Sequence, residues 1–169
     1  MSAPEVSVVV CTYTEERWDD LVAAVASIRA QPARAGAVEV IVVVDHAPAL
    51  EARARREIPG ARVVANPGAR GLSPARNAGV AAAHGAIVAF LDDDGVAARG
   101  WLARLAAHFA ATDVVAAGGA VLPRWDAGRP AWFPPEFDWV VGCSYRGLPT
   151  TTAEAVSYTH LTLPTICSV

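Results

Sequence analysis

Residues 71–94 read GLSPARNAGVAAAHGAIVAFLDDD, and this stretch decides the class of fold. Ser73-Pro74 predicts the beginning of a helix, because a serine side chain can cap a helix and proline fits its first position. Residues 86–91 are nearly all apolar, which is typical of a strand that is buried on both faces. Three carboxylates, Asp92, Asp93 and Asp94, follow directly. A helix that leads into a buried strand with charge at its end is one unit of an α/β fold.

The same alternation extends to both sides of this stretch. We expect strands at residues 5–11, 38–44, 62–65 and 86–91, a fifth strand at 114–122 that Gly118-Gly119 interrupts, and an edge strand at 138–145. Helices are expected at residues 15–31, 49–57 and 100–111, in addition to the helix that begins at Ser73. Strand and helix alternating four times predict a mostly parallel sheet with helices on both faces.

Composition excludes several classes of protein. The 169 residues are 53% hydrophobic and 18% charged, which fits one folded domain and not a disordered chain. A net charge of −3 argues against a nucleic-acid partner. No apolar run reaches the ~18 residues of a membrane span. The three cysteines are scattered, which is typical of a reduced, cytoplasmic protein without structural zinc.

Polar side chains follow each of the main expected strands. Thr12 and Tyr13 follow the first, Asp45 follows the second, the glycine-rich loop 66–72 follows the third, and the three aspartates follow the fourth. Ligands of open parallel sheets bind beyond the carboxyl ends of the strands. We therefore expect all of these groups to lie around one crevice.

The aspartate triplet is the strongest local signal for chemistry. Adjacent carboxylates repel one another, which is tolerable only in water or around a cation. In extended backbone Asp92 and Asp94 point to one side and Asp93 to the other, so the outer pair can hold a hard divalent ion. The alternative is a solvated acidic turn that caps the following helix.

The remaining candidates each have a plain structural alternative. Asp45 can accept hydrogen bonds from a ribose or a base, or it can cap the helix near residue 49. Arg76 lies in the first turn of its helix, where it can reach a base or a phosphate, and the backbone amides there favour anions. Thr12 and Tyr13 offer a hydroxyl and an aromatic face.

Several strings taken together resemble the nucleotide-sugar domain of family 2 glycosyltransferases, which have the GT-A fold. They are PEVSVVVCTYTEERWDDL (4–21), VIVVVDHAPAL (40–50), GARGLSPARNAGVAAAHGAIVAFLDDD (68–94) and GWLARL (100–105). The segment WFPPEFDWVVGCSYRGLPT (132–150) is similar to a subgroup of glucosyl-dolichyl-phosphate glucuronosyltransferases. The similarity runs from about Pro4 to Leu148.

The resemblance implies a role for each candidate residue. The residues implied in nucleotide-sugar binding are Thr12, Tyr13, Asp45, Arg76, Asp92 and Asp93, and those implied in binding Mg²⁺ or Mn²⁺ are Asp94 and Asp92. Many relatives have an acidic residue where this chain has Gly95 and a second aspartate where it has His46. These departures leave open which carboxylate of the triplet contacts the metal.

The resemblance also implies the reaction and its partners. It implies an inverting transfer of a sugar from a nucleotide-diphosphate donor, a UDP-sugar being the first expectation, to an acceptor hydroxyl or a polyprenyl phosphate. The latter acceptor would bring a cytoplasmic enzyme to the inner face of the cell membrane as a peripheral protein.

The end of the chain departs from the family pattern. Relatives continue into an acceptor-binding half that carries the general base, and we expect that half to be missing here. Residues 1–149 are then a truncated nucleotide-sugar domain, and 150–169 are a tail whose part from about Val156 resembles translated sequencing adapter. We expect a natural protein about twice as long, and a fragment with little or no transferase activity.

Two other classes of function are compatible with parts of the sequence. AFLDDDGVA (89–97) also resembles the first motif of haloacid-dehalogenase-type phosphatases, with Asp92 as nucleophile, Asp94 as acid/base and Mg²⁺ between them. The absence of lysine and the position of the motif on the fourth strand argue against this class. The second alternative is a nucleotide-sugar binding module without catalysis.

Overall fold

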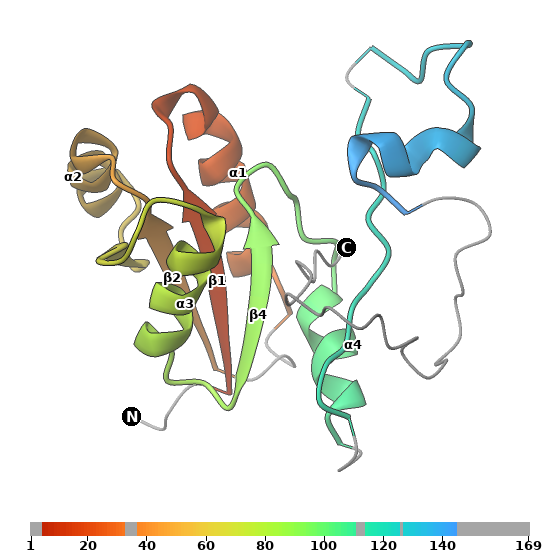
Figure 1. Cartoon of the computed structure of the whole chain (residues 1–169). Helices are drawn as coiled ribbons and strands as arrows, with labels where there is room; N and C mark the ends of the chain where they lie inside the picture. Colours follow the sequence, from red (N-terminus) through yellow and green to blue (C-terminus); the bar gives the residue numbers. More distant parts are fainter. Residues whose placement is uncertain (1–4, 33–36, 111–113, 126, 145–169) are drawn as a thin grey trace.

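The computed structural model describes residues 5–32, 37–110, 114–125 and 127–144. Its centre is a sheet of parallel strands in the order β3-β2-β1-β4 (Figure 1). The strands are β1 Val6–Thr12, β2 Val38–Val44, β3 Arg62–Ala65 and β4 Ile87–Asp92. The expected strands at 5–11, 38–44, 62–65 and 86–91 are confirmed to within one residue at each end.

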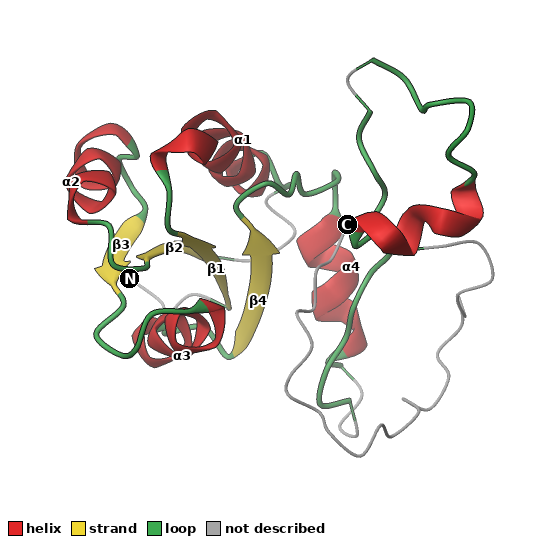
Figure 2. Ribbon diagram, turned by 45° about the horizontal axis from the view of Figure 1, so that its top comes forward, coloured by secondary structure: helices red, strands yellow, loops and turns green. Residues whose placement is uncertain are grey.

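Helices cover both faces of the sheet, as the alternation predicts. The α-helices are α1 Trp18–Arg29, α2 Pro48–Glu57, α3 Leu72–Ala82 and α4 Trp101–His108, and the 3₁₀ helices are η1 Glu15–Arg17 and η3 Pro135–Val141. Figure 2 shows α1 and α2 on one face and α3 on the other, with α4 beside the β4 edge. The predicted α/β fold class is thereby confirmed.

Two apolar cores hold these layers together. Alternate residues of β1 point to opposite faces, so Val8 and Val10 pack with α1 and α2, whereas Val9 packs with α3. Burial of these β-branched side chains on both faces explains why the strands are continuous apolar runs. Trp101 and Leu102 bring α4 into the larger core.

Helix α3 approaches the sheet closely because of Gly79. A Cβ atom at this position would lie 2.3 Å from Val9 Cγ1 and 3.2 Å from Val43 Cγ2. Only glycine leaves room for these two valines, so the helix rests directly on β1 and β2. This contact sets the position of the whole helix, including its first turn.

The register of the strands aligns their carboxyl ends. Thr12 lies opposite Val44, and Cys11 lies opposite Asp92. The residues that follow β1, β2 and β4 therefore emerge at one edge of the sheet.

Two expected strands are wrong. Residues 114–122 form no strand; Val115 is 93% exposed, and Val121 instead exchanges hydrogen bonds with Ser144. Residues 138–141 are helical rather than extended, because they belong to η3, which begins after Pro134, and no strand follows in 142–144. Asp138 of this helix pairs with Arg129 at 2.7 and 2.9 Å. Apolar composition alone does not make a strand without a partner that completes its hydrogen bonds.

Smaller differences concern helix ends. The expected helix 15–31 is divided into η1 and α1, and α3 begins at Leu72 with Gly71 at its N-cap, so Ser73 does not cap it. The expected boundary at 149/150 and the tail lie outside the described residues.

Among the helices in the described part of the chain, none combines the length and the apolar character that a bilayer span needs.

Candidate functional site

A cavity of about 510 Å³ lies at the carboxyl edge of the sheet. Its walls come from the ends of β1, β2 and β4, from η1 and from the first turn of α3. It is lined by every candidate residue that the sequence indicated: Thr12, Tyr13, Asp45, Arg76, Asp92, Asp93 and Asp94. The structure therefore places these side chains around one crevice, as expected from the sequence.

Asp45 is buried where β2 ends, and it connects three parts of the site. Its Oδ1 accepts a hydrogen bond from Asn66 Nδ2 at 2.7 Å and lies 2.7 Å from His46 Nδ1, while its Oδ2 accepts from Gly71 N at 2.8 Å. Burial alone raises the pKa of Asp45, but these hydrogen bonds outweigh it and hold the pKa below its ordinary value. Helix α2 has Ala47 at its N-cap, so the helix-cap alternative for Asp45 is wrong.

The loop before α3 is ordered by a residue that the sequence analysis did not single out. Buried Asn66 donates to Ala69 O at 2.8 Å and accepts from Gly68 N at 2.9 Å, in addition to its bond to Asp45. The loop ends at Gly71, whose φ of 137° favours glycine. This arrangement presents the N-terminus of α3 to the cavity, which favours an anionic ligand there.

The triplet is a turn, and this corrects the expectation of an extended segment. Strand β4 ends at Asp92, and Gly95 N donates to Asp92 O at 2.9 Å. As a result, Asp93 and Asp94 face the same partner: Arg17 Nη1 lies 3.2 Å from Asp93 Oδ1 and 3.2 Å from Asp94 Oδ2. Asp92 faces a different arginine, Arg76, at 2.9 Å.

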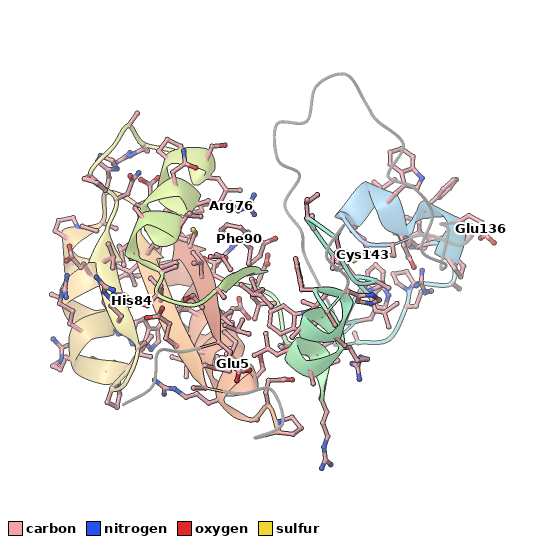
Figure 3. The ribbon with its side chains drawn as sticks, turned by 90° about the horizontal axis from the view of Figure 1, so that it is seen from below. Glu5, Arg76, His84, Phe90, Glu136 and Cys143 are labelled. Carbon is pink, nitrogen blue, oxygen red and sulfur yellow. The ribbon has the colours of Figure 1, made fainter. Side chains whose placement is uncertain are left out.

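The arginine of α3 is held between a carboxylate and an aromatic ring. The Arg76 guanidinium lies 5.7 Å from the Phe90 ring centroid, and the two side chains are labelled side by side in Figure 3. Arg76 thus presents a fixed positive charge at the cavity wall beside the helix N-terminus.

Two buried polar atoms of the cavity wall lack good partners. Thr12 Oγ1 and Asp93 Oδ2 make no hydrogen bond within the part of the chain that the structure describes. Burial raises the pKa of Asp93, and the nearby Thr12 hydroxyl and Arg17 offset only part of that increase. Unsatisfied buried polar groups are uncommon in proteins, and here both belong to residues that line the cavity.

Tyr13 and Cys11 border the cavity in different ways. Tyr13 is well exposed, so its ring is free to stack on a flat ligand. Burial raises the pKa of the Cys11 thiol to about 12, which keeps it protonated and therefore a poor nucleophile.

The carboxylates of the cavity suit a cation that binds together with a phosphate-bearing molecule. No cluster of three or more His, Cys, Asp or Glu side chains suited to a metal occurs in the described ranges. Mg²⁺ is usually held by one or two carboxylates together with substrate phosphates, so a short set of carboxylates suits a cation bound with a diphosphate. The side chains of Asp94 and Asp92 are 53% and 37% exposed and are therefore accessible from the cavity, whereas that of Asp93 is only 6% exposed.

A parallel sheet covered on both faces, with carboxylates gathered at its strand ends, defines an α/β domain of the GT-A type. The chain belongs to glycosyl transferase family 2, whose pattern it matches over residues 7–162. This membership confirms the family resemblance seen in the sequence and decides against the phosphatase alternative.

The relatives indicate how much of such a protein the chain represents. It is 37% identical over 147 residues to the glucosyl-dolichyl phosphate glucuronosyltransferase of Haloferax volcanii, covering 85% of this chain and 46% of that protein. Among solved structures it is similar to the mannosyltransferase PcManGT of Pyrobaculum calidifontis in complex with GDP-Man and Mn²⁺, at 27% identity and a TM-score of 0.53 over 73% of this chain and 37% of that one. S. aureus TarS with UDP-GlcNAc matches at 24% identity and a TM-score of 0.49, over 63% and 31%. The chain thus spans less than half the length of each.

Proposed function

We propose that the intact protein transfers a sugar, with inversion, from a nucleotide-diphosphate donor bound in the 510 Å³ cavity. The observation that carries this proposal is the convergence of Asp45, Arg76 and the aspartate triplet on one cavity at the carboxyl edge of a GT-A sheet. The family of the chain supports it, since PcManGT, at 27% identity, holds GDP-Man and Mn²⁺.

The cavity offers a different contact to each part of the donor. Thr12, Tyr13 and Asp45 are assigned to the base and ribose, because they combine a hydroxyl, an exposed ring and a buried carboxylate. Arg76 and the N-terminus of α3 are assigned to the nucleotide phosphates, which are anionic. A uridine nucleotide is our first expectation.

The triplet is assigned to the donor and its cation. Asp92 is assigned to the ribose or sugar and, with Asp94, to Mg²⁺ or Mn²⁺. Bound there, the cation would stabilise the negative charge that develops on the leaving nucleotide diphosphate. Asp93 is buried and pairs with Arg17, so we assign it an indirect effect on the bound donor, through the position of the Arg17 side chain.

The acceptor is proposed from the curated relative. A polyprenyl-phosphate-linked sugar would suit a protein that is 37% identical to a glucosyl-dolichyl phosphate glucuronosyltransferase. Such an acceptor lies in the membrane, so the protein would work at the inner face of the membrane as a peripheral enzyme. When a sugar hydroxyl is the acceptor, inversion at the anomeric carbon of the donor also needs a general base that deprotonates this hydroxyl, and we assign none of the cavity residues to that role.

Calorimetry with the chain as it exists tests the donor site. Without Mn²⁺, UDP should bind weakly; with Mn²⁺, its affinity should rise at least tenfold. Asp94→Asn should abolish that rise while circular dichroism stays unchanged. Glu51→Gln, which alters a partly exposed carboxylate of α2 outside the cavity, is the matched control.

The outcomes separate the remaining alternatives. Mn²⁺-dependent binding that is the same in Asp94→Asn as in the wild type would refute the metal assignment. Binding of UDP with Mn²⁺ without turnover, in the intact protein as well, would favour a non-catalytic binding module. Tighter binding of GDP than of UDP would correct the expected base.

A further inference from the structure

Arg17 is the cavity residue whose position was not expected from the sequence. It ends η1, directly before α1, and one of its guanidinium nitrogens contacts both Asp93 and Asp94 at 3.2 Å. Arg76 contacts Asp92 from α3, on the opposite face of the sheet (Figure 2). The triplet is therefore held between two arginines that come from the two helical layers.

Of the two ion pairs that Arg17 makes, the one with Asp93 is harder to break than the one with Asp94. The Asp93 side chain is 6% exposed, so its charge needs a lasting partner. Asp94 is 53% exposed and Arg17 itself 42%, so the contact between them is screened by water and breaks easily. Arg17 can release Asp94 while it keeps Asp93.

A cation bound to Asp94 would lie close to the positive charge of Arg17. A guanidinium within hydrogen-bonding distance of the same carboxylate competes for its oxygen and repels a divalent ion. A diphosphate reverses this effect, because its negative charge attracts both the ion and the guanidinium. The same side chain thus opposes the free ion and favours the ion that is accompanied by a diphosphate.

We propose that Arg17 is a positioning residue that makes cation binding conditional on the donor. In the donor-free protein it holds Asp94 and disfavours free metal. When a nucleotide diphosphate enters with its cation, Arg17 retains Asp93 and moves its second contact from Asp94 to the diphosphate. This inference rests on the proposed function of the cavity as a donor site.

The test compares two binding constants in the same variants. Mn²⁺ alone is titrated and followed by the electron paramagnetic resonance signal of the free ion, and UDP is titrated by calorimetry at saturating Mn²⁺. Arg17→Gln should bind Mn²⁺ alone three- to tenfold more tightly and UDP three- to tenfold more weakly. Arg17→Lys, which keeps the charge, should restore most of both effects. Arg55→Gln, on the exposed face of α2, is the control and should change neither.

Removing Arg17 also leaves Asp93 without its partner, so the fold needs its own check. The double variant Arg17→Gln/Asp93→Asn removes the buried charge together with its partner, and it should bind Mn²⁺ more tightly than Asp93→Asn alone, which has lost the same negative charge but keeps Arg17. Thermal unfolding of these variants reports whether the domain remains folded.

Opposite changes in the two constants support the inference, because a merely structural role of Arg17 would weaken both. Changes of the same sign, or no change in either, in a folded variant overturn it. Failure of the proposed function looks different: the wild type itself would then bind no nucleotide diphosphate in the presence of Mn²⁺.

Discussion

Replacement of Glu39 by glutamine should make the protein less stable at neutral pH but hardly less stable in acid. Glu39 lies at the opposite edge of the sheet from the cavity, where its Oε1 accepts hydrogen bonds from Ser7 Oγ at 2.5 Å and from His84 N at 2.6 Å. Ser7 Oγ in turn accepts from Gly85 N at 2.8 Å. One carboxylate therefore ties β1, β2 and the turn between α3 and β4 together.

The size of the effect follows from the pKa of this carboxyl group. Burial alone raises the pKa of Glu39, but the hydrogen bonds from Ser7 and His84 outweigh it and lower the pKa from 4.5 to about 2. That difference corresponds to about 3 kcal/mol of stability at neutral pH. Because the side chain is 18% exposed, screening by water makes about 2 kcal/mol the better expectation.

The sign and the pH window follow from the same values. A carboxyl group whose pKa is lower in the folded state stabilises the fold above its ordinary pKa and loses this contribution as the pH falls. The stabilisation by Glu39 is therefore complete above about pH 5 and lost between 4.5 and about 2. Glutamine lacks the charge at every pH, so the wild type and Glu39→Gln should converge in acid.

Urea unfolding followed by tryptophan fluorescence measures this difference, since Trp18 and Trp101 lie in the larger core. The free energy of unfolding of the two proteins is compared at several pH values between 7 and 2.5. Glu51→Gln removes a partly exposed carboxylate of α2 that pairs with Arg55 one turn away, and it should change the free energy of unfolding by less than about 0.5 kcal/mol. A difference between the wild type and Glu39→Gln that stays constant with pH would refute the reasoning.

Two further variants test the packing of the fold. Gly79→Ala should lower the free energy of unfolding by about 1–3 kcal/mol, although alanine is the better helix former, because its Cβ would lie 2.3 Å from Val9 Cγ1; an unchanged urea midpoint would contradict this contact. Arg129→Gln should speed proteolytic cleavage within residues 114–144, because the bonds from Arg129 hold the pKa of Asp138 below its ordinary value and keep its buried charge paired. Cleavage at the wild-type rate would show that this pair does not order the segment.

Much of the fold could be predicted because its strands are buried on both faces. Such strands are continuous apolar runs, and the polar residues after them mark the ligand edge of the sheet. The run at 114–122 is apolar as well, yet it forms no strand, because pairing with a neighbouring strand is a property of the tertiary structure. Composition cannot report whether such a neighbour exists.

The candidate site could be predicted as a group of residues but not as a geometry. Topology alone brings Thr12, Asp45 and Asp92 to one edge. The contact of Arg17 with Asp93 joins residues 76 positions apart, and in the sequence Arg17 is simply a charged residue near the start of a helix. The predicted orientation of the three aspartate side chains was wrong. Strand β4 ends at Asp92, so the alternation of side chains along a strand does not apply to Asp93 and Asp94.

The close contact of Gly79 with the sheet has a practical consequence for engineering. Position 79 determines how high α3 sits above β1 and β2, and Arg76 is carried on the same helix one turn earlier. A library designed to change which donor is accepted should therefore keep glycine at 79 and vary Leu72, which borders the cavity and is half exposed. Substitutions there alter the lining without displacing the arginine.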